Sequence, residues 1–389
     1  MLTEHFHNTQ KDTGHYSNDL RYVLSLQNTI AAFEEIKTWE GYAKTPLHSL
    51  DSLASDIGVK NIYYKDESSR FGLGSFKALG GTYGVLKFIH HALKKEIGDE
   101  VSMKDIHAGK YSEQISKYTV TTATDGNHGR SVAFGAKLFG CKCQIYIHSE
   151  VSSGRQKAME DLEATVNRVS GNYDESLQIC IEDAGKNNWY VISDTSYEGY
   201  TKYPRYIMAG YNVMAEEIID QIKDRPLPTH VFLQGGVGSF PGAICGYFWE
   251  KFPGNNIKFV VVESEHAPCL IRSAQNNQMT SVSIKQETMM AGLSCGEPSL
   301  LGWEILKSGT DDFITINDSS IPGLMRLLAK NNLKIEAGES SVAGLAGLIE
   351  SMEDQKIAET MELDKESIVL LFGTEGATDP DIYRSIISE

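Results

Sequence analysis

The chain has 389 residues, of which 41% are hydrophobic and 23% are charged, and its formal net charge at pH 7 is −16. This composition is ordinary for a globular enzyme, and the length exceeds one hydrophobic core, so we expect two domains or one domain with an insertion. The acidic balance argues against nucleic acid and anionic membranes as partners, because both require a basic surface. It leaves open a phosphate-bearing cofactor, which backbone N–H groups can hold.

Several features indicate a cytoplasmic protein. The first residues, 1–7, are polar and lack the apolar segment of a signal peptide, and apolar runs such as 367–372 are too short to cross a bilayer. Six cysteines in a chain of this length do not make a disulfide framework. We expect Cys269 and Cys295, which lie in loop-like segments, to be free thiols.

Short apolar runs alternate with helical patterns along the chain, which predicts an α/β fold. Several runs are continuously apolar, as is typical of parallel strands that are buried on both faces. Helical patterns at 129–138, 154–162 and 206–223 separate these runs. The expected strands are 61–65, 118–121, 143–147, 190–192, 231–234, 259–263 and 368–372.

These elements predict two open, mostly parallel sheets flanked by helices. We expect residues 96–205 to form a small domain and the flanking segments, 1–95 and 206–389, to pair into a larger one. Open α/β sheets bind ligands at the carboxyl ends of their strands, so the expected active site lies in the interdomain cleft.

Lys77 stands among aromatic, small and apolar residues, with glycines on both sides. Burial lowers the pKa of an amine because it penalises the charged form, and a neutral amine can form a Schiff base with an aldehyde. The alternative is an ordinary lysine at a helix start whose ammonium reaches water. The other motifs decide between these two interpretations.

The segment 121–130 follows a strand and opens a helix. The amide of Asn127 can donate to a ring hydroxyl or oxyanion, and backbone N–H groups from Thr124 to Asn127 can hold a substrate carboxylate. Asp125 could instead be a helix cap. His128 has no partner at ligand spacing, so we expect no metal site. Asp194, after the strand at 190–192, is either functional or a turn residue.

A glycine-rich loop at 233–242 also follows a strand and opens a helix, an arrangement that suits an anion. It matches the dinucleotide fingerprint poorly, and the nucleoside-triphosphate loop is absent from the sequence. A plain turn is the alternative. Thr374 supplies a neutral hydroxyl after the last apolar strand. The loop residues expected to bind phosphate are Gly235, Gly236, Val237, Gly238 and Ser239.

The segments 75–77, 126–129 and 235–238 resemble those of the tryptophan-synthase-β-like pyridoxal-phosphate enzymes, which are known as fold type II. The longer strings 65–73, 123–130, 194–200 and 374–380 resemble the diaminopropionate ammonia-lyases among them. The resemblance runs from about Tyr42 to about Pro380. It implies a lyase of amino acid catabolism that uses pyridoxal 5'-phosphate, and commonly a homodimer.

The resemblance also implies roles for single residues. Lys77, preceded by Phe76, would bind the cofactor aldehyde, with the glycine loop on the phosphate, Asn127 on the ring hydroxyl and Thr374 on the ring nitrogen. Lys77 and Asp125 would remove the α-proton of the L- and D-enantiomer respectively, and Asp194 would assist the leaving β-amine. Thr124, Asp125, Gly126 and Asp194 would contact the substrate.

Asp125 favours a diamino acid as the substrate. Threonine and serine dehydratases of this fold usually have serine at this position, and a carboxylate suits a second amine better than it suits a hydroxyl. We therefore expect α,β-elimination of 2,3-diaminopropionate to pyruvate and two ammonia. The alternatives are a serine or threonine dehydratase that includes D-serine, a nicotinamide oxidoreductase, and a non-catalytic amino-acid-binding relative.

Overall fold

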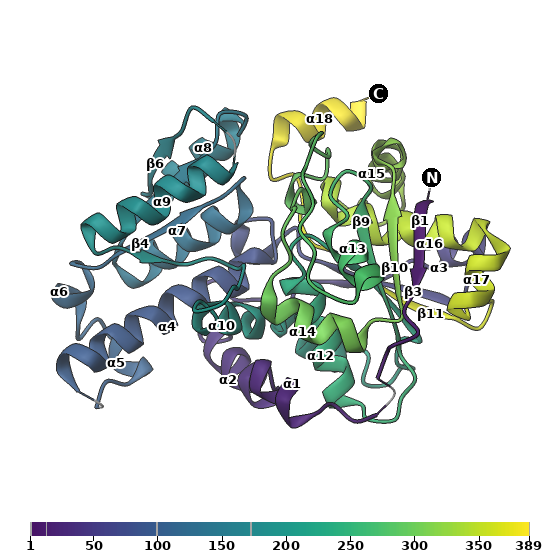
Figure 1. Ribbon diagram of the computed structural model, residues 1–389, viewed down its shortest axis with the longest axis horizontal. Coiled ribbons are helices and arrows are strands. Elements are labelled where there is room, and N and C mark those ends of the chain that lie inside the picture. Colours follow the sequence, from purple (N-terminus) through teal and green to yellow (C-terminus); the bar gives the residue numbers. More distant parts are fainter. Residues whose placement is uncertain (1, 13, 99, 172, 389) are drawn as a thin grey trace. The chain divides into compact units, whose positions relative to one another are not determined.

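The computed structural model describes residues 2–12, 14–98, 100–171 and 173–388. The chain divides into two compact units (Figure 1). The first unit comprises Met1–Phe76, Thr195–Gly199 and Tyr211–Glu389, and the second comprises Lys77–Asp194 and Tyr200–Gly210. None of the helices in the described ranges is long and apolar enough to cross a bilayer.

The first unit is built on a mostly parallel sheet, for which the described residues give the order β1-β10-β9-β8-β11-β3-β2. The outer strands β1 and β2 are antiparallel to their neighbours, and the others run parallel. The strands are β1 (Leu2–His7), β2 (Leu47–Ser49), β3 (Asn61–Asp66), β8 (His230–Gln234), β9 (Lys258–Ser264), β10 (Asp312–Ile316) and β11 (Ile368–Gly373).

Helices cover both faces of this sheet. Phe372 in β11 packs edge-on against Phe240 of α12, whereas its neighbour Leu371 belongs to the apolar cluster that includes Leu345 of α16. Because adjacent strand residues point to opposite faces, α12 and α16 lie on opposite sides. The helices are α1 (Asn18–Val23), α2 (Leu26–Ile36), α3 (Asp51–Ile57), α11 (Val213–Gln221), α12 (Ser239–Lys251), α13 (Cys269–Asn276), α14 (Leu300–Gly309), α15 (Ile321–Lys330), α16 (Ala343–Glu353), α17 (Gln355–Met361) and α18 (Pro380–Ser388).

The second unit has a smaller, all-parallel sheet in the order β6-β5-β4-β7. Ile145 in β5 faces Gly129 of α7, and its neighbour Tyr146 packs against Cys180 of α9, so these helices lie on opposite faces. The elements are β4 (Thr119–Ala123), β5 (Lys142–Ile147), β6 (Thr165–Arg168), β7 (Tyr190–Val191), α4 (Lys77–Ile97), α5 (Met103–His107), α6 (Ser112–Ile115), α7 (Asn127–Phe139), α8 (Ser153–Glu160), α9 (Tyr173–Asn187) and α10 (Lys202–Tyr211).

Helix α4 belongs to the second unit because it packs closely on α7. A Cβ added to Gly81 would come within 1.8 Å of the Ser131 hydroxyl, and Thr82 donates to the Ser131 carbonyl at 2.9 Å. Residues Lys77–Ile97 therefore lie in this unit. The expected division into domains 1–95, 96–205 and 206–389 stays a prediction.

The fold class expected from the sequence is confirmed: two mostly parallel sheets are each flanked by helices. One expected helix is wrong in extent. The segment 206–223 forms parts of two helices, α10 and α11, which meet at Asn212. The side-chain amide of this buried residue donates to the Thr29 hydroxyl at 3.0 Å. Strands β1, β2, β6 and β10 were not expected.

Candidate active site

Lys77 and Asp194 form an ion pair in the second unit. Lys77 is the first residue of α4, and Asp194 lies in the loop after β7. The Lys77 ammonium donates to Asp194 Oδ2, and their side chains are 21% and 14% exposed. The neighbours of Lys77 in the sequence are aromatic, small and apolar, whereas the fold places a carboxylate against its Nζ atom. The site therefore brings together two residues that are separated by 117 positions.

His128 lies beside this ion pair. Its Nε2 atom is 2.8 Å from the Ile192 carbonyl, and its Nδ1 atom is 3.8 Å from Asp194 Oδ2. A carbonyl only accepts, so Nε2 carries the proton and the unprotonated Nδ1 faces the carboxylate. Burial is the largest cause of the lowered pKa of His128, so the ring is neutral. The sequence analysis considered His128 only as a metal ligand. Its position directly after Asn127, a predicted cofactor-binding residue, could have indicated that it lies near the site.

The loop that carries Asp194 is held by a tyrosine of the same motif. Tyr200 donates its hydroxyl to the Val191 carbonyl at 2.9 Å and accepts the Ser193 N–H at 3.0 Å. These two bonds fix the backbone immediately before Asp194. The Asp194 carboxylate is thus held against Lys77, and both side chains remain partly exposed to solvent.

Asp125 belongs to a second pair in the same unit. Its Oδ1 atom is 2.7 Å from His148 Nε2, and the carboxylate side chain is 32% exposed. Asp125 follows β4 and His148 follows β5, two neighbouring parallel strands, so their carboxyl ends place both residues at one edge of the sheet. Sequence reasoning did not consider His148.

Thr124 fixes the loop between β4 and α7. Its hydroxyl accepts the N–H groups of Gly126 and Gly129 at 3.0 and 3.1 Å, and its own N–H donates to the Tyr146 carbonyl at 3.0 Å. The N–H groups of Thr124 and Gly126 are therefore used within the protein. Asn127 begins α7 and is half-buried. Gly129 must lack a side chain, because a Cβ there would lie 2.4 Å from Thr124 Cγ2.

The glycine loop of the first unit makes a tight turn at the start of a helix. Gly236 and Gly238 have φ angles of 58° and 95°, in the left-handed region, and Ser239 then begins α12. Successive N–H groups in such a turn, at a helix N-terminus, make a cradle for a phosphate. The Val237 carbonyl accepts the Ser299 N–H at 2.7 Å and holds the loop in place.

The buried side chain of Glu263 packs against this loop. A Cβ on Gly235 would lie 2.6 Å from Glu263 Cγ, so the two residues are in close contact. Glu263 accepts the N–H groups of Leu270 and Ile271 at 2.8 and 2.7 Å at the start of α13. Burial, the largest cause, raises the pKa of Glu263 to about 8. This residue at the end of β9 was also missed, because its support of the loop depends on strand pairing.

Thr374 lies next to the segment that leads to Lys77. The Phe76 N–H donates to the Thr374 carbonyl at 3.1 Å, and the Phe76 ring packs against Tyr211 and Phe240 with centroid distances of 4.7 and 4.8 Å. The Ser341 hydroxyl lies 3.4 Å from the buried Thr374 hydroxyl. Within the first unit, Phe76 and Thr374 are thus placed together by backbone pairing.

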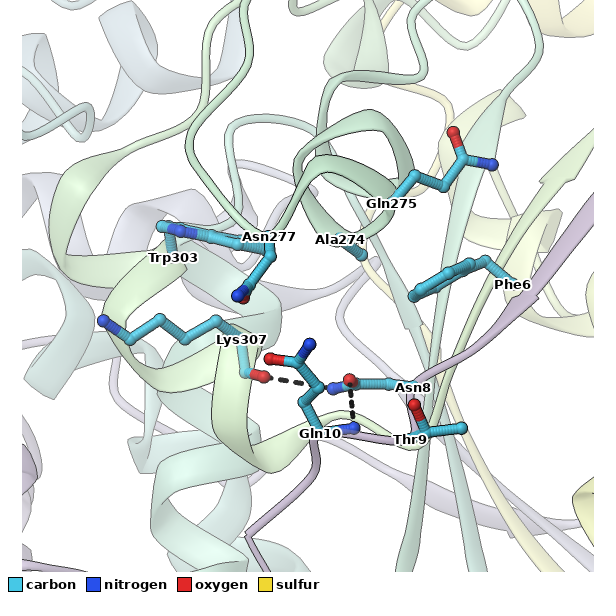
Figure 2. Close-up of a pocket in the computed structure, with 9 residues that line it drawn as sticks. All are labelled: Phe6, Asn8, Thr9, Gln10, Ala274, Gln275, Asn277, Trp303 and Lys307. Carbon is cyan, nitrogen blue, oxygen red and sulfur yellow. Dashed lines mark hydrogen bonds between the residues drawn. The ribbon is translucent and has the colours of Figure 1, made fainter.

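Other features lie away from these residues. A small cavity of about 70 Å³ lies elsewhere in the first unit (Figure 2), and the predicted site residues do not line it. Across the described ranges, no three His, Cys, Asp or Glu side chains are grouped so that they could hold a metal ion. The cavity is lined by Phe6, Asn8, Thr9, Gln10, Ala274, Gln275, Asn277, Trp303 and Lys307.

Comparison with known proteins places the chain in a family. Residues 38–373 match the family described as pyridoxal-phosphate dependent enzyme. Diaminopropionate ammonia-lyase of Escherichia coli strain K12 is 38% identical over 357 residues, which cover 90% of this chain and 88% of that protein. The chain belongs to the diaminopropionate ammonia-lyase family of pyridoxal-phosphate-dependent enzymes.

The three-dimensional comparison agrees with this family. The crystal structure of the Escherichia coli diaminopropionate ammonia-lyase, in complex with an aminoacrylate–pyridoxal-phosphate azomethine reaction intermediate, gives a TM-score of 0.88 at 34% identity. The match covers 100% of this chain and 97% of that one. A probable D-serine dehydratase of Sinorhizobium medicae is less similar, at 23% identity over 334 residues, which cover 81% of this chain and 74% of that protein.

Proposed function

We propose that this chain converts 2,3-diaminopropionate and water to pyruvate and two ammonia, and that it accepts both enantiomers. The observation that carries the proposal is the Lys77–Asp194 ion pair in the same unit as Asp125. The Lys77 amine, which can bind an aldehyde, is paired with the Asp194 carboxylate, and the same unit contains the Asp125 carboxylate. The ammonia-lyase relatives support the same reaction.

Each unit by itself carries groups that suit one part of pyridoxal phosphate. Gly236 and Gly238 have left-handed backbone conformations that a residue with a Cβ atom would adopt only with strain. A backbone without side chains at these positions lets a phosphate approach closely. We assign the phosphate to the loop from Gly235 through Val237 to Ser239 and the aldehyde to Lys77. Asn127 would meet the ring hydroxyl and Thr374 the ring nitrogen, while Phe76 packs beside the site. Bound pyridoxal phosphate makes the α-proton of an amino acid acidic by withdrawing electrons.

Each proton transfer has a named side chain. Lys77 Nζ takes the α-proton of the L-enantiomer, and the Asp125 carboxylate takes that of the D-enantiomer. Asp194 orients the β-ammonium and helps it to leave, because a carboxylate forms a charge-assisted hydrogen bond with a second amine. We assign the substrate carboxylate to the backbone N–H groups of the loop from Thr124 to Asn127.

The experiment that tests this function measures pyruvate release by the purified holoenzyme from D- and L-diaminopropionate, with threonine, L-serine and D-serine as competitors. We expect diaminopropionate to have the highest kcat/KM. A higher kcat/KM on threonine or on either serine would move the assignment to a dehydratase. No contact in the described residues favours that alternative.

We also propose that the enzyme is a cytoplasmic homodimer that acts in amino acid catabolism. The resemblance to the family supports the dimer. Light scattering of the purified holoenzyme tests the dimer by its mass, and fractionation of the source cells tests the compartment. A monomer mass, or recovery of the protein in the membrane fraction, would contradict this proposal.

A further inference from the structure

His148 has a defined orientation beside Asp125. It follows directly after β5, and its ring is 14% exposed. The Glu150 N–H donates to His148 Nδ1 at 3.4 Å, so Nδ1 is an acceptor. In the neutral ring the proton is then on Nε2, which lies 2.7 Å from Asp125 Oδ1. The imidazole therefore donates to the carboxylate.

This hydrogen bond has two physical consequences for Asp125. It fixes the rotation of a carboxylate that is 32% exposed and would otherwise turn freely, and it occupies Oδ1 so that Oδ2 is left as the basic atom. Both effects serve a residue that must accept a proton from a fixed direction.

We propose that His148 is a positioning residue that holds Asp125 as the base for the D-enantiomer. The inference rests on the proposed function. His148 does not touch the substrate: the Cα–H bond breaks, its proton goes to Asp125 Oδ2, and the imidazole keeps its own proton on Nε2. The L-enantiomer, whose base is Lys77, does not depend on His148.

The test compares two substitutions on both enantiomers. His148→Leu removes the donor, and we expect kcat for D-diaminopropionate to fall roughly tenfold to a hundredfold, which is less than the roughly 10²–10⁴-fold that loss of the base itself costs in Asp125→Asn. We expect the L-reaction to change less than twofold. His148→Gln keeps an N–H donor and should recover most of the D-activity. His107→Leu, an exposed histidine of the same unit, is the control.

A readout without turnover is the ¹⁵N NMR spectrum of the histidine rings in the purified protein, assigned with His148→Gln. We expect the Nε2–H tautomer for His148, and a shifted Nε2 signal in Asp125→Asn. An Nδ1–H tautomer would overturn the inference. So would equal losses for both enantiomers in His148→Leu, no rescue by His148→Gln, or a wild-type enzyme that turns over only the L-enantiomer. If the wild-type enzyme released no pyruvate from either enantiomer, that result would overturn the proposed function, and this inference with it.

Discussion

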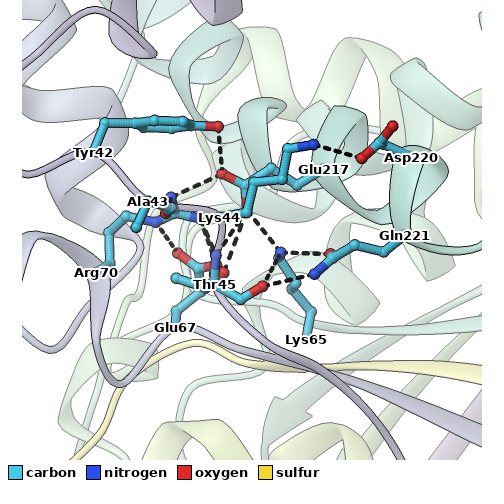
Figure 3. A network of polar contacts seen from close by, with 10 residues as sticks. All are labelled: Tyr42, Ala43, Lys44, Thr45, Lys65, Glu67, Arg70, Glu217, Asp220 and Gln221. Atoms are coloured by element: carbon cyan, nitrogen blue, oxygen red, sulfur yellow. Dashed lines mark hydrogen bonds and ion pairs between the residues drawn. The ribbon is translucent and has the colours of Figure 1, made fainter.

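Two clusters of charged side chains each contain a lysine, but they differ in how far that lysine is buried. In the first unit, Lys65, Arg70 and Glu217 form a network in which each side chain is at most 1% exposed (Figure 3). In the second unit, the Lys77–Asp194 pair is 21% and 14% exposed. The side chain of Lys65 is fully buried, whereas that of Lys77 is partly exposed to solvent.

The buried network satisfies its charges with many hydrogen bonds. Lys65 Nζ donates to Glu217 at 2.7 Å, to Gln221 at 2.9 Å and to the Thr45 carbonyl at 2.9 Å. Arg70 donates to Glu217 and, through Nε, to Glu67 at 2.7 Å. A buried charge must be paired in this way because desolvation is costly. The comparison teaches that burial with complete pairing makes a structural lysine, while partial exposure leaves a lysine available for chemistry.

The substitution with the largest expected effect is Lys77→Ala. It should remove the visible absorbance of the lysine-bound cofactor and lower kcat by roughly 10⁴-fold or more, since both the covalent anchor and a base are lost. Absorption spectra and pyruvate assays measure this. Lys65→Met is the matched comparison: it should keep the absorbance and lose stability. Unchanged absorbance in Lys77→Ala would falsify the Schiff-base assignment.

Breaking the buried network should cost the most stability. Glu217→Leu leaves Arg70 and Lys65 without their shared carboxylate, and we expect the free energy of unfolding to fall by about 3–5 kcal/mol. Denaturant unfolding measures this. Glu366→Leu removes an exposed pair, with Lys60 55% and Glu366 65% exposed, and should cost about 0–1 kcal/mol. Equal costs for the two variants would mean that burial does not distinguish these pairs.

The same network predicts an acid-sensitive contribution to stability. Burial raises the pKa of Glu217, but Arg70 and Lys65 outweigh burial and lower it to about 2, from 4.5. A depressed folded-state pKa stabilises the fold above the unfolded pKa, so this stability is complete above about pH 4.5 and is lost as the pH falls toward 2. Glu217→Gln should flatten the stability curve between these values. An unchanged slope would contradict the pairing.

The smallest expected change concerns the glycine loop at Gly235. Gly235→Ala places a Cβ 2.6 Å from Glu263 Cγ and should cost about 1–3 kcal/mol of stability and weaken cofactor binding. Gly323→Ala is the control, because nothing lies within 4 Å of its Cβ position in α15, and it should gain roughly 0.5–1 kcal/mol. Thermal unfolding and titration with pyridoxal phosphate separate the two. If the control lost as much as Gly235→Ala, the clash would not be the cause.

Parts of the fold could be predicted because they depend on local patterns. The runs at 231–234, 259–263 and 368–372 are apolar except for the last residue of the first two, and they form the parallel strands β8, β9 and β11. The edge strand β1 carries the mixed sequence LTEHFH, and its pairing with β10 bridges most of the chain, so no local pattern indicated it. The break at Asn212 depends on Thr29, another distant residue.

By itself, the sequence determined the fold class, the family and the glycine loop, because apolar runs, glycine spacing and turn residues act over a few neighbouring positions. Tertiary structure alone decided which side chains meet. Lys77 reaches Asp194 across 117 positions, and Asp125 reaches His148 across 23. The carboxyl ends of neighbouring parallel strands bring residues such as Asp125 and His148 together. Short-range charge pairing then determines their chemistry, and the spacing of residues along the sequence does not reveal it.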